Sequence, residues 1–469
     1  MTRMRKKALF IFVLSFLVYL FYFSGTNPGY YSRDVVESLK GLLNTDNLFN
    51  GSLPNFYDES FFYKIYILVF YLVTKNLVAL GLFQIVLASA INTYCWIILT
   101  KFSKAKVAWL VTLLMIFSPV NGFMTIWYHR SSLFACLVCL NLILLYKFSK
   151  VQRFERLERS TFLINLLLIS FLRLDGIIVS LGSLFIYILK SKHRKQIKIG
   201  IFVGFILMLS IYNLAPKGCN YRNRGFFLIF PFTSQVQRIH QSTGSEFTDK
   251  DLKVLNKIVD SDLDIKLWLE EKGWLDYSIF NEKIAQKESS DFIRWSSLFI
   301  LRNLPHFIKT QAQVFFDSSL LGSPLAYYFH NNDLHRNEDY FIEVKKRVPN
   351  ISNNPYIEFP DKIGRFILKY RHYNFLGNPR AFFVALIFGT SIPFVLIFAY
   401  FVIALKRNRN VLIPLVPLLL YGIFMFLFQP KAKAYYWYWL AYSYYFIVFG
   451  LGYEIISAKK SISLKGEGR

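Results

Sequence analysis

The sequence predicts an all-α polytopic membrane protein with about ten transmembrane helices and both termini in the cytoplasm. Hydrophobic residues make up 54% of the chain and aromatic residues 19%, and the mean hydropathy is +0.35. Many apolar stretches are roughly 15 to 25 residues long, the length that an α-helix needs to cross a bilayer. The 55 Lys and Arg residues fall mostly in short loops between these stretches, as the positive-inside rule requires.

This placement of basic residues also explains the net charge of +26. A strongly basic protein can bind nucleic acid, but then its Lys and Arg gather in a patch or stripe. Here they alternate with apolar stretches, so we expect no nucleic-acid partner. The four cysteines lie in or directly after apolar stretches. Cys136 and Cys139 form a C-x-x-C pattern without a second ligand pair, which indicates packing rather than metal or redox chemistry.

Ten apolar stretches are expected to span the membrane: residues 8–24, 77–99, 107–121, 131–147, 160–174, 176–190, 198–214, 382–405, 411–428 and 434–456. No small-residue cleavage site follows the first stretch, so we expect it to remain as an uncleaved helix. With ten spans, six basic clusters all face the cytoplasm. These clusters begin at Arg3, Lys101, Lys147, Lys190, Lys406 and Lys459.

Two segments constrain the count of spans. Residues 61–74 are apolar but about 14 residues long, which is short for a span of roughly 30 Å. We interpret them as an interfacial or re-entrant helix on the outer face. Residues 172–176 interrupt the apolar stretch 160–190 with Arg173 and Asp175. We expect two short spans with these charges at their outer turn.

This topology predicts three parts: an N-terminal membrane module over residues 1–214, a large outer loop over 215–381 and a C-terminal membrane module over 382–469. The N-terminal module contains an acidic first outer loop, residues 25–60. The large loop is expected to be mostly helical, with a helix capped by Thr248 that runs through Ile258. Further helix is expected over 286–320 with a break at 302–305, an irregular loop over 331–361, and short outer loops at 122–130 and 429–433.

The outer face therefore gathers acids and bases from several loops. A carboxylate suits proton removal from a hydroxyl, and Arg and Lys suit phosphate. Asp34 is the first candidate for a general base, because it follows the first span closely and Pro28-Gly29 should end that helix. The second acidic candidates are Asp58 and Glu59. The candidate phosphate-binding residues are Arg130, Arg173, Arg238, Lys431 and Lys433.

The alternative is that these charged side chains are solvated and have no role in catalysis or binding. For most acidic residues of the loops, this is the better interpretation. His129 and His240 are equally consistent with a role and with none, and two histidines do not form a metal site. The sequence has no Walker lysine and no G-x-G-x-x-G motif, so a cytoplasmic nucleotide site is not expected. We expect no cofactor, and the use of a divalent metal is left open.

The layout resembles the GT-C superfamily of integral membrane glycosyltransferases, over roughly residues 8–190 and 411–456. Four features carry this resemblance: Tyr31-Ser32-Arg33-Asp34, the apolar segment 60–74, the turn Arg173-Leu174-Asp175-Gly176, and Lys431-Ala432-Lys433-Ala434-Tyr435-Tyr436. Two features depart from the family pattern. Asp58-Glu59-Ser60 stands where a proline-led motif is usual, and lysines stand where Arg-Tyr is common. The segment 231–238 also resembles one in bacterial members with large outer loops.

The resemblance implies an enzyme of the bacterial inner membrane that transfers a sugar with inversion of configuration at its anomeric carbon. The donor would be an undecaprenyl-phosphate sugar, and the acceptor a surface glycan such as the O-antigen of lipopolysaccharide. Asp34 would act as base, while Arg130, Arg173 and Lys433 would hold the leaving phosphate. Two alternatives remain open: an O-antigen polymerase, and a flippase or transporter. Transporters usually show inverted repeats and charges within their spans, and the predicted spans here are almost free of charge.

Overall fold

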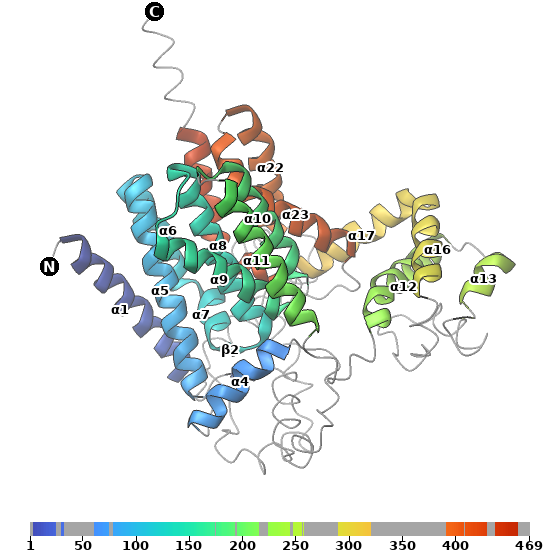
Figure 1. Ribbon diagram of the computed structural model, residues 1–469, viewed down its shortest axis with the longest axis horizontal. Helices are drawn as coiled ribbons and strands as arrows, with labels where there is room; N and C mark the ends of the chain where they lie inside the picture. Colours follow the sequence, from blue (N-terminus) through green and yellow to red (C-terminus); the bar gives the residue numbers. More distant parts are fainter. Residues whose placement is uncertain are drawn as a thin grey trace, which may run out of the picture. The chain divides into compact units, whose positions relative to one another are not determined.

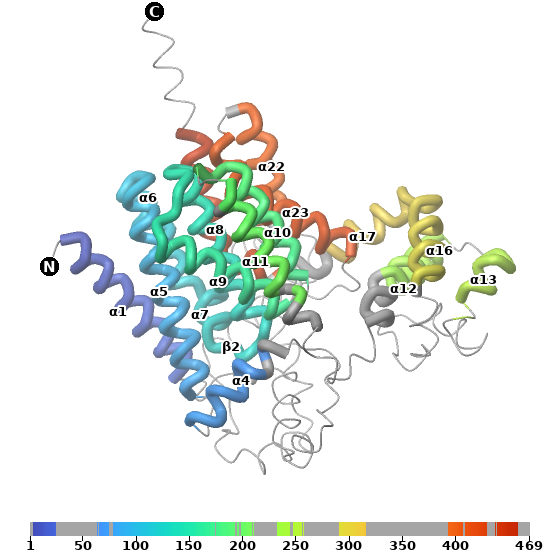
Figure 2. The backbone as a smooth tube through the Cα atoms, viewed as in Figure 1, coloured from blue at the N-terminus to red at the C-terminus, as the bar shows by residue number. Residues whose placement is uncertain are grey.

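The structure is a computed structural model, and Figures 1 and 2 show its ribbon and backbone path. It describes residues 3–24, 30–31, 61–74, 78–173, 175–192, 195–214, 224–243, 247–255, 257, 289–319, 391–407, 409–428 and 437–457. The chain divides into two compact units. Unit 1 comprises Met1–Ala215, Ser319–Gly422 and Ala434–Arg469, and unit 2 comprises Pro216–Ser318 and Ile423–Lys433. The division predicted from the sequence, into 1–214, 215–381 and 382–469, stays a prediction.

The protein is α-helical in the part of the chain that the structure describes, apart from two short strands, and its apolar helices indicate a membrane protein. Four helical segments there are long and apolar enough to cross a bilayer. They are α1 (Arg3–Ser24), α5 (Val78–Phe102), α8 (Arg130–Val151) and the joined helices η2 (Arg409–Val411) and α23 (Leu412–Phe428). A fifth is added if α6 (Ala105–Phe117) and α7 (Pro119–Ile126), bent by 54°, form one span.

The other helices of unit 1 are α4 (Phe61–Thr74), α9 (Arg156–Leu172), α10 (Gly176–Lys190), α11 (Lys195–Leu214), α22 (Ser391–Arg407), α24 (Tyr438–Ala441) and the π-helix η4 (Phe446–Leu451). All of them except α11, which has 20 residues, are shorter than the candidate spans. Each lies in or largely overlaps a stretch that the sequence predicts to be apolar helix. Their lengths do not by themselves establish ten spans.

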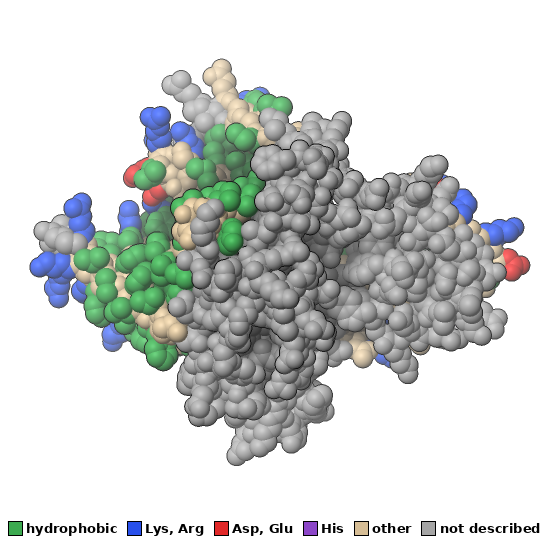
Figure 3. Space-filling view, turned by 90° about the horizontal axis from the view of Figure 1, so that it is seen from below, with side chains coloured by type: hydrophobic (Ala, Val, Ile, Leu, Met, Phe, Trp, Pro, Cys, Tyr) green, Lys and Arg blue, Asp and Glu red, His purple; other side chains and the backbone are tan. Residues whose placement is uncertain are grey.

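The surface of α1 is what a lipid-facing helix requires. Leu9, Phe10, Leu17 and Phe21 are each more than half exposed, while the opposite face packs against α5. Figure 3 shows hydrophobic side chains gathered on this part of the surface, with Lys and Arg beyond them at the left, where Figure 1 places the start of α1. A helix that exposes large apolar side chains and carries basic residues at one end fits a bilayer with that end at the headgroups.

Helix α8 lies at the centre of unit 1, and almost its whole length is buried. It packs against α5, α9 and α24. An apolar cluster that includes Phe148, Phe162, Leu184 and Tyr187 joins α8 to α9 and α10. A helix that is apolar on all sides is expected in this central position.

The bend between α6 and α7 follows from Pro119. Proline has no N–H, so the carbonyl of Met115 loses its donor four residues later. Two side chains replace that donor: Asn121 Nδ2 lies 3.0 Å and Tyr19 Oη 3.2 Å from the Met115 oxygen. The freed carbonyl is thus satisfied inside an apolar bundle, where an unpaired carbonyl would cost several kcal/mol.

Tyr19 also belongs to a buried polar network that ties helices together. Asn92 Nδ2 on α5 donates to Ser15 Oγ and to Tyr19 Oη on α1, at 2.8 Å each. Tyr442 Oη, which directly follows α24, donates to Tyr19 Oη at 3.2 Å. These bonds join the N-terminal helix to the last described segment of the chain.

Unit 2 contains α12 (Arg224–Thr243), α13 (Asp249–Leu255), α16 (Ser289–Arg302) and α17 (Leu304–Ser319). α12 packs against α16, and α16 packs against α13. Thr248 caps α13 as expected, because its Oγ1 accepts the Asp251 N–H while the Asp251 carboxylate accepts the Thr248 N–H. The break between α16 and α17 falls at Asn303, inside the predicted break.

One expectation needs correction, and three elements were not predicted individually. The helix from Thr248 is shorter than predicted, because α13 ends at Leu255 and Lys257 lies in a turn. The predicted outer loop 122–130 contains the end of α7, and its Trp127–Tyr128 form strand β2. α12 lies in the large loop that the sequence predicts to be mostly helical, but Pro231 interrupts the pattern that would identify it as a separate helix. The predicted loop 331–361 lies outside the described residues.

Candidate functional site

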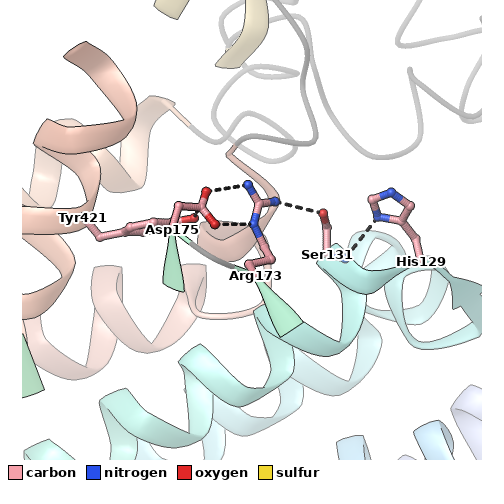
Figure 4. A network of polar contacts seen from close by, with 5 residues as sticks. All are labelled: His129, Ser131, Arg173, Asp175 and Tyr421. Atoms are coloured by element: carbon pink, nitrogen blue, oxygen red, sulfur yellow. Dashed lines mark hydrogen bonds and ion pairs between the residues drawn. The ribbon is translucent and has the colours of Figure 1, made fainter. Parts of the chain in front are cut away.

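The turn between α9 and α10 holds a bidentate ion pair. Arg173 follows α9 in extended backbone, and Asp175 directly precedes α10. Arg173 Nε donates to Asp175 Oδ1 at 2.9 Å, and Arg173 Nη2 donates to Asp175 Oδ2 at 2.7 Å. Figure 4 shows this pair face to face. The planar guanidinium matches both carboxylate oxygens at once, which lysine could not do.

Two other helices contribute to the same group. Arg173 Nη1 donates to Ser131 Oγ on α8 at 3.2 Å, and the guanidinium lies 5.3 Å from the centre of the Phe134 ring. Tyr421 Oη on α23 donates to Asp175 Oδ2 at 3.0 Å. The pair therefore fixes the α9–α10 turn against α8 and α23 (Figure 4).

The pair is largely shielded from water, since the side chains of Arg173 and Asp175 are 9% and 20% exposed. Burial by itself raises the pKa of Asp175, but the charge and hydrogen bonds of Arg173, the Tyr421 hydroxyl and the charge of Arg130 together bring it below the ordinary value. Asp175 is therefore ionised at neutral pH. Arg130, Arg173 and Asp175 together carry one net positive charge.

His129 begins α8 beside this cluster. Its Nδ1 accepts the N–H of Ser131 at 3.1 Å, so Nδ1 carries no proton and a neutral ring holds its proton on Nε2. The imidazole stacks on Trp127, with ring centres 4.5 Å apart and planes 8° apart. Both side chains are buried. The stack and the helix cap fix the orientation of His129.

Strand β2 connects this region to the segment that the sequence predicts to be the first outer loop. Tyr30–Tyr31, strand β1, pairs in parallel with Trp127–Tyr128, and Tyr31 lies opposite Tyr128. The end of α1, just before β1, is also closely packed. Phe23 and Tyr22 lie so near Gly81 and Gly122 that an added Cβ atom on either glycine would clash with them.

The structure brings together two of the predicted phosphate ligands, Arg130 and Arg173. Arg130 is the first residue of α8 and is half-buried. Arg238 belongs to unit 2, where its Nη2 donates to Gln311 Oε1 at 3.3 Å and burial lowers its pKa to about 10. His240 stacks on Phe247 in the same unit. The remaining candidates lie outside the described residues: Asp34, Asp58, Glu59, Lys431 and Lys433.

Three residues of this region were not anticipated: Ser131, Tyr421 and Trp127. Ser131 and Tyr421 sit in stretches that predict membrane helix, and no local pattern marks their hydroxyls as partners of a charge. Tyr421 lies 246 residues from Asp175 in the sequence. Among the described residues, no group of three or more His, Cys, Asp or Glu side chains is placed to hold a metal ion.

The chain matches no protein-family model, no curated protein and no solved structure.

Proposed function

We propose that the protein is a membrane glycosyltransferase that moves one sugar from an undecaprenyl-phosphate-linked donor to a surface glycan such as the O-antigen. In this proposal it has ten spans and cytoplasmic termini in the bacterial inner membrane, and the site faces outward. The alternatives are an O-antigen polymerase and a lipid-linked glycan flippase.

The observation that carries the proposal is the pairing of β1 with β2. Asp34 follows Tyr31 by three residues, and Arg130 follows Tyr128 by two. Tyr31 lies opposite Tyr128, and three residues of chain reach at most about 11 Å, so Asp34 and Arg130 each follow this pair by a short segment of chain. A carboxylate and a phosphate-binding cation that follow the same pair of strands are the two groups that the transfer requires.

The positions of the basic loops support the proposed topology. Lys150 pairs with Glu454, and the Lys104 ammonium lies 5.9 Å from the Tyr453 ring. The Lys192 N–H donates to the Gln152 carbonyl. Three loops that the sequence assigns to the cytoplasmic side and the end of the last predicted span thus meet at one end of unit 1. Arg130 begins the helix that carries Lys150 near its end, so the arginine cluster lies toward the other face.

The proposed reaction is a single inverting displacement. Asp34 takes the proton of an acceptor hydroxyl, whose oxygen bonds to the anomeric carbon as the bond from that carbon to the phosphate oxygen breaks. The leaving group is undecaprenyl phosphate, and cations near it stabilise its developing charge. General-base catalysis of this kind contributes about 10²–10⁴-fold to the rate.

The geometry suggests different roles for the two arginines. The fork of Arg173 is occupied by Asp175 and its remaining terminal nitrogen donates to Ser131. We therefore assign the direct phosphate contact to Arg130, while Arg173 positions the turn and adds positive charge behind it. The apolar helix α4 would line the groove for the polyprenyl chain.

The test measures transfer of labelled sugar from a polyprenyl-phosphate donor to glycan in membranes. Asp34→Asn keeps the size of the side chain but cannot accept a proton at neutral pH, so the rate should fall roughly 10²–10⁴-fold at normal expression. Asp58→Asn and Glu59→Gln are matched controls that should transfer normally. Loss in Asp58→Asn with normal transfer by Asp34→Asn would move the base to the second acidic pair. Normal transfer by all three would contradict a carboxylate base in this loop.

A further inference from the structure

Helices α16 and α17 present a row of apolar side chains to the outside of unit 2. Leu298, Leu301, Leu304 and Ile308 are 47%, 64%, 42% and 50% exposed. The opposite faces of the two helices are packed, with buried Phe292, Ser296, Ile300, Phe307, Gln311, Val314 and Phe315. Each helix therefore has a packed apolar face and, on its exposed side, a second set of large apolar side chains.

Basic side chains flank this row. Arg294 and Arg302 on α16 and Lys309 on α17 are exposed, and each lies within one helical turn of a row member. No Asp or Glu occurs between residues 292 and 316. Leucine and isoleucine bordered by Arg and Lys form the pattern of a helix that lies in a membrane interface, with its cations at lipid phosphates.

A second, independent observation ties α17 to the end of a candidate membrane span. Gln311 Nε2 donates to the carbonyl of Leu427 at 3.0 Å, and Gln235 of α12 donates to the same carbonyl. Leu427 is the penultimate residue of α23, which ends the candidate span Arg409–Phe428. The last carbonyls of a helix have no donors within it, so the two glutamines satisfy the end of a membrane helix. Rings of the same segments also meet, since Phe315 lies 5.9 Å from Phe426.

We propose that the row Leu298, Leu301, Leu304 and Ile308 is inserted into the surface of the bilayer, with Arg294, Arg302 and Lys309 bound to anionic headgroups. α16 and α17 then lie in the interface beside the end of α23. The cations favour a lipid surface over a second copy of this chain, because two copies of this face would place like charges against each other. This inference does not depend on the transferase proposal.

The experiment uses the full chain in vesicles of phosphatidylethanolamine and phosphatidylglycerol. Single nitroxide labels are attached at Leu301→Cys and Ile308→Cys in a background with Cys219→Ser; the other three cysteines are buried. Gln313→Cys is the matched control, since Gln313 is exposed on α17 about 140° around the helix from Ile308. Collision rates with oxygen, which concentrates in lipid, and with a water-soluble nickel chelate are measured by paramagnetic resonance.

Labels at Leu301 and Ile308 should collide several-fold more with oxygen than with the chelate, and the Gln313 label should show the reverse. Chelate-accessible labels at all three positions would overturn the proposal, because the row would then face water. Labels at 301 and 308 that are immobile and shielded from both reagents would also overturn it and indicate a covering protein surface.

A second comparison tests the cations. Arg294, Arg302 and Lys309 are replaced together by glutamine, and the ratio of oxygen to chelate collisions is measured for the label at position 301. In vesicles containing phosphatidylglycerol, this ratio should fall toward its value in pure phosphatidylcholine. An unchanged preference would overturn the assignment of anionic lipid as the partner. All three side chains are exposed, so the variant is expected to fold.

Discussion

Arg173 is the residue whose expected role the structure changes most. From the sequence it is a phosphate ligand at a membrane junction, but its guanidinium is directed at Asp175 and Ser131. A largely buried ion pair is costly to break from one side, because the remaining charge loses its partner. The first consequence of substitution should therefore be loss of the turn that carries both residues.

We expect Arg173→Lys and Asp175→Asn to lower turnover to a similar extent, with little change in the donor KM. Each leaves one member of the pair without its bidentate partner. Arg130→Gln should instead raise the donor KM, because it removes the proposed phosphate contact. Steady-state kinetics with a polyprenyl-phosphate sugar separate these effects. If Arg173→Lys raised the donor KM and Asp175→Asn had normal kinetics, Arg173 rather than Arg130 would make the direct contact with the donor phosphate.

Asp251 offers a pH test in unit 2. Burial raises its pKa, but hydrogen bonds from the Trp295 indole, at 2.6 Å, and from Thr248 bring it below the ordinary value. The carboxylate therefore stabilises the folded state fully above the pKa of an unfolded aspartate, about 3.9. This stabilisation is lost as the pH falls from there through the lowered pKa of the folded state.

Amide exchange of peptides covering residues 247–255, corrected for the intrinsic pH dependence, should show protection that falls over this acidic range. At neutral pH, Asp251→Asn should exchange about fivefold faster, since a helix cap contributes about 1 kcal/mol. Asp249→Asn is the control, because Asp249 lies in the same first turn and is exposed. Equal effects of both substitutions would show that general helix charge, rather than the capping contacts, is responsible.

Among the elements, the helices predicted best are those with an uninterrupted apolar sequence. The predicted stretch 176–190 coincides with α10, and 131–147 lies within α8. Local pattern identifies these helices because length and apolarity alone define a membrane segment. It fails for α7 and β2, because their form depends on Pro119 and on pairing with a distant strand. The Asp175–Tyr421 contact could not be predicted from local pattern either, since it joins elements far apart in the sequence.

Gly176 is the residue that lets α9 and α10 meet closely. A Cβ atom at this position would lie 2.5 Å from the Ile169 carbonyl oxygen and 2.8 Å from the Phe134 ring. We expect Gly176→Ala to lower the thermal unfolding temperature and the transfer rate, because either the turn or the Arg173–Asp175 pair must shift.

Gly182, on the same helix, is the matched control. Its added Cβ would meet only atoms at 3.5 Å or more, and alanine favours helix over glycine by up to about 1 kcal/mol. Gly182→Ala should therefore keep or raise the unfolding temperature in detergent. If the two variants unfolded at the same temperature, the close approach at Gly176 would not be a constraint.

For the whole molecule, the class of fold is readable from the sequence, but the number of spans is not settled by helix length. Four or five helical segments meet the length requirement among the described residues, and several helices that the sequence predicts to span are 15 to 17 residues long. A helix of about 16 residues rises roughly 24 Å, so it spans only where the bilayer thins or the flanking residues snorkel.

Reporter fusions test the topology directly. Fusions at Asn50, His240 and Asp333 should report the outside, and fusions at Ser103, Gln152 and Asn408 should report the cytoplasm. The physical reason is the charge asymmetry of the short loops, since Lys and Arg are retained on the cytoplasmic side. An inside signal at Asn50 or His240 would exclude both the ten-span topology and an outward-facing site.

The polar network around Tyr19 has a consequence for biosynthesis. Tyr19 lies on α1 and is hydrogen-bonded to Tyr442, 423 residues later. Tyr146 on α8 likewise donates to Glu454. Until the segment that carries Tyr442 and Glu454 is made, Tyr19 and Tyr146 therefore lack these partners. Polar groups in that position attract substitute partners, so nascent chains of this protein should depend strongly on the membrane insertase and should be degraded when synthesis stops early.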